Sequence, residues 1–241
     1  ARFNTLETVQ VERFTARATS VRVTRRERMR DERENASESR FRQPPAAESR
    51  FRNRFPLRFL SGMSAFEVLF GFDMETDIGS WTSSHDGLIH GTPRVLDLMA
   101  RHGVTGTFYF VGASARAVPG SVRSVCDAGH EVGAHSLHHE TVGDPLFPVP
   151  GAHPLLPEEL LPRLERNTQW VEEVAGVRPV SFRAPRLFGS TALCNALEQL
   201  GYVSDASYPF YRFRERLEPY HPDAAEWTRP GGLRLVEIPN F

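Results

Sequence analysis

The sequence contains no lysine, only two cysteines and no long uninterrupted apolar segment. Cys126 and Cys194 are too few for the disulfide frameworks of small secreted domains, and both lie in helix-like patterns, so we expect packed thiols rather than a disulfide. No run is long and apolar enough to predict a transmembrane helix. The first residues lack the basic and apolar regions of a signal peptide, which favours a cytoplasmic location.

Because lysine is absent, every basic side chain other than histidine is an arginine, and the arginines are unevenly distributed. Residues 1–62 contain 15 arginines against 8 acidic residues, whereas the remaining residues contain 14 against 22. The first segment lacks sustained periodicity, and we predict that it is disordered. The arginine bias and Met63 also suggest that it is translated upstream of the natural start. An Arg/Phe arm that binds nucleic acid or anionic lipid is the alternative.

From residue 63 onward, strand-like and helix-like patterns alternate, which predicts a single α/β domain over residues 63–241. A chain of 241 residues with 40% hydrophobic composition is long enough to bury one sizeable core. The alternation favours a parallel sheet covered by helices. The predicted strands are 66–72, 104–111, 131–135, 179–183, 201–205 and 233–238, and the predicted helices are 92–102, 118–128, 156–175 and 190–200.

Two histidines follow one of these predicted strands at a spacing of four residues. The stretch Gly129–His139 begins with the alternation typical of a short buried strand and then presents His135 and His139. If the chain turns helical after the strand, both imidazoles lie on one face and can reach one ion. A hydrolytic metal site adds a carboxylate to such a pair and leaves room for water and substrate. A polar helix face is the alternative interpretation.

Three acidic residues crowd the end of another predicted strand. The apolar run 65–72 is followed by Asp73, Glu75 and Asp77. In barrels and open α/β sheets, functional side chains gather at the carboxyl ends of the strands, so these acids are expected to meet the histidines. The alternative for each acid is a solvated turn that caps the next helix.

An arginine follows a third strand-like run, Val180–Pro185. Beside the acidic residues, the guanidinium of Arg183 would keep a carboxylate ionised and would orient it by bidentate hydrogen bonding. An ordinary surface charge is the alternative.

Taken in order, these residues resemble the polysaccharide deacetylase family of carbohydrate esterases, whose domain is called NodB-like. The resemblance rests on the acidic strand end, the His-Ser-x-x-His segment at 135–139, the Arg-x-Pro at 183–185 and the Asp-x-Ser at 205–207. Residues 91–112 also resemble the first helix and second strand of that family. The similarity extends over about residues 66–240.

The resemblance implies a distorted (β/α)7-type barrel, whereas the sequence offers six candidate strands. The closing strand of the family carries a Leu-x-His element whose histidine protonates the leaving amine. Nothing of that kind follows Glu237, and His153 and His221 lie in loop-like or polar stretches that make them poor substitutes. We therefore expect the chain to be truncated at its C-terminal end, without the last strand of the barrel.

Roles for three residues follow from the resemblance. Asp73 matches the general base of the family, and Arg183 matches the residue that pairs with this acid. Asp205 matches the acid that supports the histidine missing here.

The resemblance also implies a divalent metal held by two histidines and one carboxylate. His135 and His139 match the histidine ligands. The family most often has two adjacent acids followed by glycine, but the pattern here is Asp-x-Glu-x-Asp, so Glu75 is the expected third ligand and Asp77 the reserve. Zinc is the expected ion, and such a site also accepts nickel, cobalt or iron.

The implied activity is metal-dependent hydrolysis of an acyl amide on an amino sugar or polysaccharide, in which a metal-bound water attacks the carbonyl and acetate or formate leaves. The partner is then an N-acylated glycan, and no nucleic acid is expected. One alternative is a metal-independent, allantoinase-like hydrolase of cyclic amides from the same superfamily. Another is a non-catalytic glycan-binding relative. Trp81 is a candidate platform for a sugar ring or a packing residue, and the Pro- and Gly-rich segment Thr141–Pro157 is expected to be a loop beside the site.

Overall fold

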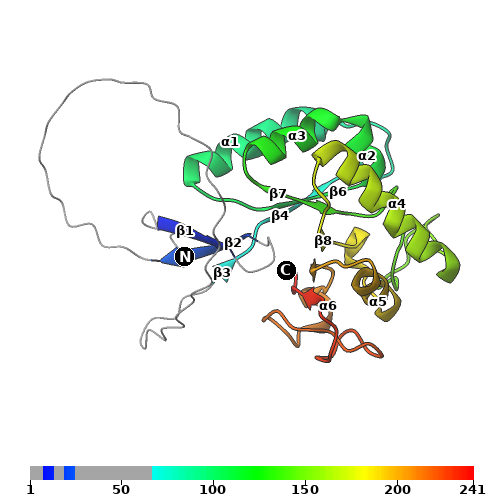
Figure 1. The fold of residues 1–241 in the computed structure, drawn as a ribbon. Helices are drawn as coiled ribbons and strands as arrows, with labels where there is room; N and C mark the ends of the chain where they lie inside the picture. The colour runs from blue at the N-terminus through cyan, green and yellow to red at the C-terminus, as the bar shows by residue number, and fades with distance from the viewer. Residues whose placement is uncertain (1–7, 14–18, 25–66) are drawn as a thin grey trace, which may run out of the picture.

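A parallel β-sheet of six short strands lies at the centre of the structure, a computed structural model that describes residues 8–13, 19–24 and 67–241 (Figure 1). The strand order across the sheet is β10-β9-β8-β7-β6-β4, so β4 and β10 form its two edges. The strands are β4 (Gly71–Met74), β6 (Thr107–Phe110), β7 (Glu131–Ala134), β8 (Ser181–Phe182), β9 (Ser204–Asp205) and β10 (Val236–Glu237).

All six predicted strands correspond to strands of this sheet, but the first of them is divided. Glu67–Val68 forms β3, which pairs with an N-terminal strand in a second sheet, and β4 begins only at Gly71. β4 continues through Asp73, which therefore lies inside the strand rather than after it. Between the two strands, Leu69 and Phe70 are partly exposed. The apolar run predicts one strand because its composition does not reveal where the pairing partner changes.

Helices separate the strands of the sheet, as expected for parallel neighbours. The four predicted helices are confirmed to within one residue at each end, as α1 (Thr92–His102), α3 (Pro119–Asp127), α4 (Pro157–Ala175) and α5 (Thr191–Gln199). The structure adds elements too short to give a periodic signal: η1 (Gly87–Gly91), α2 (Gly112–Ala117), η2 (Pro185–Leu187) and α6 (Phe210–Phe213). The segment 141–157 is a loop, as predicted, with an isolated bridge between Thr141 and Pro154.

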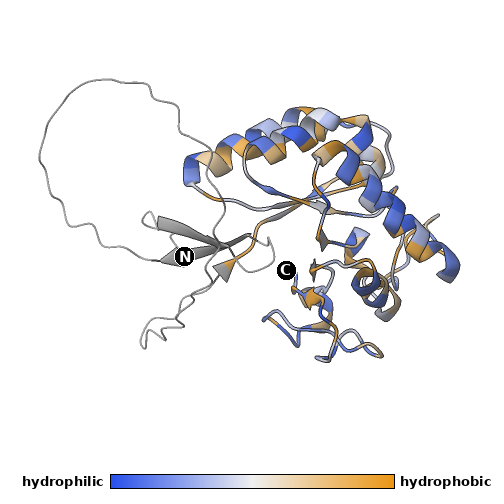
Figure 2. Ribbon diagram, in the orientation of Figure 1, coloured by the Kyte–Doolittle hydropathy of each residue, from blue (hydrophilic) through white to orange (hydrophobic). Residues whose placement is uncertain are grey.

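Two apolar clusters bury the helices against the sheet. One cluster joins α1 and α3 to β4, β6 and β7 and includes Met74, Met99 and Val122. The other joins α4 and α5 to β7 and β8 and includes Leu164, Phe182, Leu197 and others. The helices are apolar on one side only (Figure 2), the pattern of helices that cover a sheet. Cys126 and Cys194 are both free thiols, as predicted.

A second, antiparallel sheet lies at the N-terminal end of the described chain, with β1 (Thr8–Arg13), β2 (Thr19–Thr24) and β3. The sequence patterns predict no regular structure here. Both strands alternate valine with polar residues over a few positions, too briefly for a sustained signal. The other residues of the predicted N-terminal extension lie outside the described part, and the division at residue 62 stays a prediction. Within the described residues, no helix combines the length and apolarity needed to cross a bilayer.

The central sheet is curved, and the side chain of Arg183 spans the concave side from β8 to β4. Arg183 follows β8 yet reaches Asp73 on β4, which lies three strands away in the sheet order. Gly71 makes this crossing possible, because a Cβ at that position would lie 2.1 Å from Nη2 of Arg183. The curl therefore places the carboxyl ends of β4, β7 and β8 around one space.

Candidate metal centre and catalytic residues

Glu75, His135 and His139 converge at the carboxyl ends of β4 and β7. One ligand atom from each of the three lies within 4.8 Å of the others. Oε2 of Glu75 is 2.5 Å from Nε2 of His139 and 3.3 Å from Nε2 of His135. Both histidines are buried. The structure thus brings together the three residues predicted as ligands, and metal binding by them stays a prediction.

The two histidines meet through a tight turn, and not on one face of a helix, the arrangement considered from the sequence. Ser136 and His139 both adopt positive φ, at 65° and 61°. The first N–H groups of α2 explain the turn: Gly112 donates to the carbonyl of Ser136 at 3.0 Å and Ala113 to that of Leu137 at 2.9 Å. These donors have no partner within their own helix, and their bonds to Ser136 and Leu137 hold the turn against the start of α2.

A hydrogen bond fixes the tautomer of His135. Its Nδ1 lies 2.7 Å from the backbone carbonyl of Arg183. A carbonyl only accepts, so Nδ1 carries the proton, and in the neutral ring the lone pair is on Nε2, which faces Glu75. Burial opposes a charge on His135, but Asp73 and Glu75 outweigh it and raise its pKa. Burial likewise opposes ionisation of Glu75, but the two neighbouring histidines outweigh it and lower its pKa to about 2.

The three ligand candidates fit a divalent metal. Among the described residues, Oε2 of Glu75 and Nε2 of His135 are buried and accept no hydrogen bond of good geometry. Two imidazoles and one carboxylate are the ligand set of many hydrolytic zinc sites. Gly79 in β5 (Asp77–Ser80) closes the site on one side, since a Cβ there would lie 3.5 Å from both Oε1 of Glu75 and Cε1 of His139.

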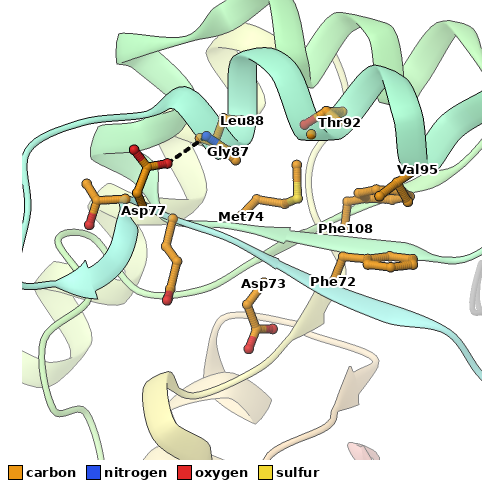
Figure 3. Close-up of a pocket in the computed structure, with 12 residues that line it drawn as sticks. Phe72, Asp73, Met74, Asp77, Gly87, Leu88, Thr92, Val95 and Phe108 are labelled. Carbon is orange, nitrogen blue, oxygen red and sulfur yellow. Dashed lines mark hydrogen bonds between the residues drawn. The ribbon is translucent and has the colours of Figure 1, made fainter.

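Asp73 lies beside this cluster and is held by Arg183. Nη1 of Arg183 donates to Oδ1 of Asp73 at 2.8 Å, while Oδ2 is 3.9 Å from Nε2 of His135. The guanidinium also stacks over the ring of Tyr109, at 4.3 Å from the ring centre. Asp73 is 40% exposed, so a substrate can reach its carboxylate. Figure 3 shows Asp73 and Met74 on opposite sides of β4, with Met74 turned toward the helices.

Asp77, the reserve ligand, is engaged elsewhere. Its carboxylate accepts a hydrogen bond of 2.6 Å from the backbone N–H of Gly87 (Figure 3). It also accepts from the hydroxyl of Ser84 at 2.6 Å and from the backbone N–H of Asp86 at 3.1 Å. These bonds, that of Ser84 most strongly, lower the pKa of Asp77. Asp77 thus caps the turn before α1, the alternative that the sequence left open, and is not among the three convergent ligand candidates.

Asp205 lies on β9, which pairs with β8, the strand that Arg183 follows. It is fully buried, and its Oδ1 accepts a hydrogen bond of 2.5 Å from Ser207. Its neighbour is Glu237 on β10, a residue that the sequence patterns do not single out. An acidic residue inside the apolar run 235–238 was the available signal. The role of Asp205 as support for a histidine stays a prediction.

Open space adjoins the centre on two sides. A cavity of about 350 Å³ is bounded by the loop after β5 and by α2, and His139 forms part of its wall. A second cavity, of about 330 Å³, is lined by Asp73, Glu75 and residues of η1 and α1 (Figure 3). Trp81 directly precedes Thr82, which lines the first cavity. The side chain of Trp81 is 61% exposed, so its ring is not fully packed in the core.

Comparison with known proteins gives a direct match. A sequence profile of the family described as polysaccharide deacetylase matches residues 76–204, more than half of the chain. This span includes His135, His139 and Arg183 and ends on either side just short of Asp73, Glu75 and Asp205. The inclusion of Asp73 and Glu75 in the site therefore rests on the geometry described above.

Two characterised relatives are of one kind. The chain is 26% identical over 145 residues to a peptidoglycan-N-acetylglucosamine deacetylase of Bacillus cereus, covering 60% of this chain and 58% of the relative. It is 26% identical over 202 residues to a peptidoglycan deacetylase of Helicobacter pylori, covering 73% and 66%. The chain thus spans less than two thirds of the length of both relatives.

A solved structure shares the fold. The structure of a Mycobacterium smegmatis protein assigned as a polysaccharide deacetylase superimposes with a TM-score of 0.57 at 27% identity, over 72% of this chain and 58% of that one. The predicted barrel-type α/β fold is therefore confirmed, and whether a further strand closes it stays a prediction.

Proposed function

Because the chain belongs to the polysaccharide deacetylase family, we propose that it hydrolyses the acyl amide of an N-acylated amino sugar within a glycan, releasing acetate or formate and a free amine. The family predicted from the sequence is confirmed by this membership. The observation that carries the proposal is the convergence of Glu75, His135 and His139 next to the pair of Asp73 and Arg183.

Glu75 and the two histidines would hold a divalent ion, which supplies a positive charge that polarises the amide carbonyl and acidifies water. The protein prepares the ligands for this task. The backbone carbonyl of Arg183 holds the proton of His135 on Nδ1 and so keeps Nε2 available. Glu75 stays ionised at any pH near neutrality because its pKa is about 2.

Asp73 is the proposed general base. The contact with Arg183 keeps one oxygen occupied and fixes the rotamer, which leaves Oδ2 turned toward the ligand cluster. The same contact orients the carboxylate that accepts a proton from water. Asp73 then holds this proton until the departing nitrogen takes it up. The net reaction consumes one water. One of its hydrogens ends on the amine and the other on the carboxylic acid, which then ionise according to pH.

The proposed substrate class is an N-acetylated glycan such as peptidoglycan, the substrate named for both characterised relatives. The two cavities beside the centre are large enough for parts of a sugar chain. The exposed ring of Trp81, which directly precedes the cavity-lining Thr82 in the sequence, would offer an apolar platform for a sugar ring.

The test measures acetate and formate release from peptidoglycan, chitooligosaccharides and small N-acyl sugars, together with the metal content of the protein. Asp73→Asn keeps the shape of the side chain but removes the base, so we expect kcat to fall by about 10²–10⁴-fold at unchanged metal content. Asp97→Asn is the matched control, because Asp97 pairs with Arg101 on the exposed face of α1. Full activity in Asp73→Asn would refute the assigned base.

Metal removal separates the proposal from its alternative. We expect activity to disappear after treatment with a chelator and to return with zinc or another divalent ion. Activity that is indifferent to chelation, with a cyclic amide as the preferred substrate, would favour the allantoinase-like alternative.

A further inference from the structure

Two buried carboxyl groups, Asp205 and Glu237, face one another at the far edge of the sheet. They are directly paired positions of the parallel strands β9 and β10, and one oxygen of each lies within 4.8 Å of the other. Both side chains are fully buried. Two adjacent ionised carboxylates at such a place would repel strongly, because solvent does not screen them.

The hydrogen bonds leave room for one proton between the two groups. Oε1 of Glu237 accepts from the backbone N–H groups of Ser207 at 3.0 Å and Tyr208 at 2.7 Å, and Oδ1 of Asp205 accepts from the hydroxyl of Ser207 at 2.5 Å. Among the described residues, Oδ2 of Asp205 and Oε2 of Glu237 have no other partner. A single proton shared by the two carboxyl groups would give each of them a partner.

A line of hydrogen bonds connects this pair to the candidate active site. The hydroxyl of Ser207, which donates to Asp205, accepts from the backbone N–H of Ala184 at 2.8 Å. Ala184 directly follows Arg183, whose carbonyl binds Nδ1 of His135 and whose guanidinium binds Asp73. Ser207 thus holds the backbone at 183–184. Of these two residues, Arg183 binds Asp73, the proposed base, and His135, a ligand candidate.

We propose that Glu237 is a positioning residue: it shares one proton with Asp205, and the pair fixes, through Ser207, the backbone of Arg183 and Ala184 that orients Asp73 and His135. The effect on chemistry rests on the proposed function, whereas the shared proton does not. Burial raises the pKa of Glu237 well above its ordinary value, and Asp205 raises it further. Burial also raises the pKa of Asp205, to about 6, although hydrogen bonds from Ser207 and Glu237 oppose the rise.

The first experiment measures the free energy of unfolding as a function of pH for the wild type and for Glu237→Gln. Glutamine has the shape and the donor of a protonated glutamate. A raised pKa means that the folded wild type keeps a proton that the unfolded chain loses above about pH 4.5, so its stability falls as pH rises. We therefore expect the folding equilibrium constant of Glu237→Gln to increase relative to that of the wild type, by up to about tenfold per pH unit, as pH rises from about 5 toward neutrality.

Other titratable groups around the pair do not mimic this result. Burial raises the pKa values of Cys194, Tyr109, Tyr208 and Tyr220, so these groups stay neutral in that range. His221, which contacts the carbonyl of Leu235, is present in all variants and cancels in the comparison.

Glu198→Gln is the matched control for the same substitution. Glu198 also holds β10, because it accepts from the backbone N–H of Leu235 and from Arg234, but these bonds outweigh its slight desolvation and lower its pKa. We expect Glu198→Gln to show no gain with rising pH. If Glu237→Gln gave the same pH dependence as the wild type, Glu237 would be ionised in the folded protein and the shared proton would be refuted.

The second experiment observes the Nδ1–H resonance of His135 by NMR in the metal-free protein, which requires no activity. We expect Glu237→Gln to preserve its chemical shift. Glu237→Ala and Ser207→Ala should move it, because each breaks the line of hydrogen bonds. In parallel, kcat on an N-acyl sugar should fall in the alanine variants with KM little changed and should recover in Glu237→Gln. An unmoved resonance in both alanine variants would overturn the positioning role, whether or not the protein deacetylates any substrate tested.

Discussion

Arg183 serves two parts of the site through different atoms. Its guanidinium binds Asp73, while its backbone carbonyl fixes the tautomer of His135. A substitution at Arg183 therefore removes the first contact and leaves the second in place, because any residue supplies a carbonyl. The guanidinium in turn depends on the absence of a side chain at Gly71 and on stacking over Tyr109.

Gly71→Ala tests this dependence at a position remote from the metal ligands. The added methyl group would lie 2.1 Å from Nη2 of Arg183, so the guanidinium must move away from Asp73. We expect a loss of about 10–100-fold in kcat, the usual effect of disturbing a residue that orients a functional side chain, at unchanged metal content.

Gly91→Ala is the control for this substitution, because a Cβ at Gly91 meets no atom within 4 Å. Steady-state kinetics and metal analysis of both variants make the comparison. Equal activity of the two variants would show that the contact between Arg183 and Asp73 contributes little.

At the scale of elements, the N-terminus of α2 shapes the turn that carries His139. The N–H groups of Gly112 and Ala113 bind the carbonyls of the turn at Ser136 and Leu137. A helix of only six residues thus sets the backbone conformation of a segment that follows the next strand in the sequence. The geometry of the metal site depends on this packing as well as on the ligands themselves.

Ala113→Pro removes one of these two N–H donors with little cost to α2, because proline is tolerated in the first turn of a helix. We expect the affinity for zinc to fall by about tenfold or more, since the carbonyl of Leu137 loses its partner and the turn loosens. Isothermal titration calorimetry measures the affinity. Ala113→Ser keeps the N–H and should bind zinc with the affinity of the wild type. If Ala113→Pro also bound zinc with that affinity, the contact with α2 would not contribute to zinc binding.

The regular elements could be predicted because their patterns are local. The strands are short apolar runs, and helices such as α4 begin at proline and end near a glycine in the left-handed region. The ligand candidates and Arg183 could also be found from the sequence, because strand ends in such folds meet at one edge. These predictions need no knowledge of how distant segments pack.

Other features escape prediction because they depend on distant contacts. The turn after His135 follows from donors on α2, and no pattern within 135–139 reveals them. Glu237 gains its role only from its pairing with Asp205, 32 residues earlier in the chain. Asp77 is ambiguous in sequence because a capping carboxylate and a ligand carboxylate look alike, and only its bonds to Gly87 and Asp86 distinguish them.

At the scale of the whole molecule, a bound metal would join β4 to β7 across the sheet. Any ligand that binds only the folded protein stabilises it, by about 2.7 kcal/mol at a concentration of 100 times Kd. For a domain of this size, we expect zinc at that concentration to raise Tm by roughly 5–10 °C.

Differential scanning fluorimetry with and without zinc measures this shift. In His139→Ala the shift should disappear, because the site loses one of its three ligand candidates. Replacing His221 instead should leave the shift intact, since the ring of His221 contacts the carbonyl of Leu235 and does not belong to the ligand cluster. An equal shift in His139→Ala would place the bound zinc elsewhere.

The two edge strands of the central sheet are connected through its interior, from Asp73 on β4 to Glu237 on β10. This has a consequence for the order of assembly during synthesis. The residues proposed to bind metal and accept a proton emerge from the ribosome well before β10. Their final alignment waits until the nascent chain has added that strand, so a partly synthesised chain has the reactive groups without their working arrangement.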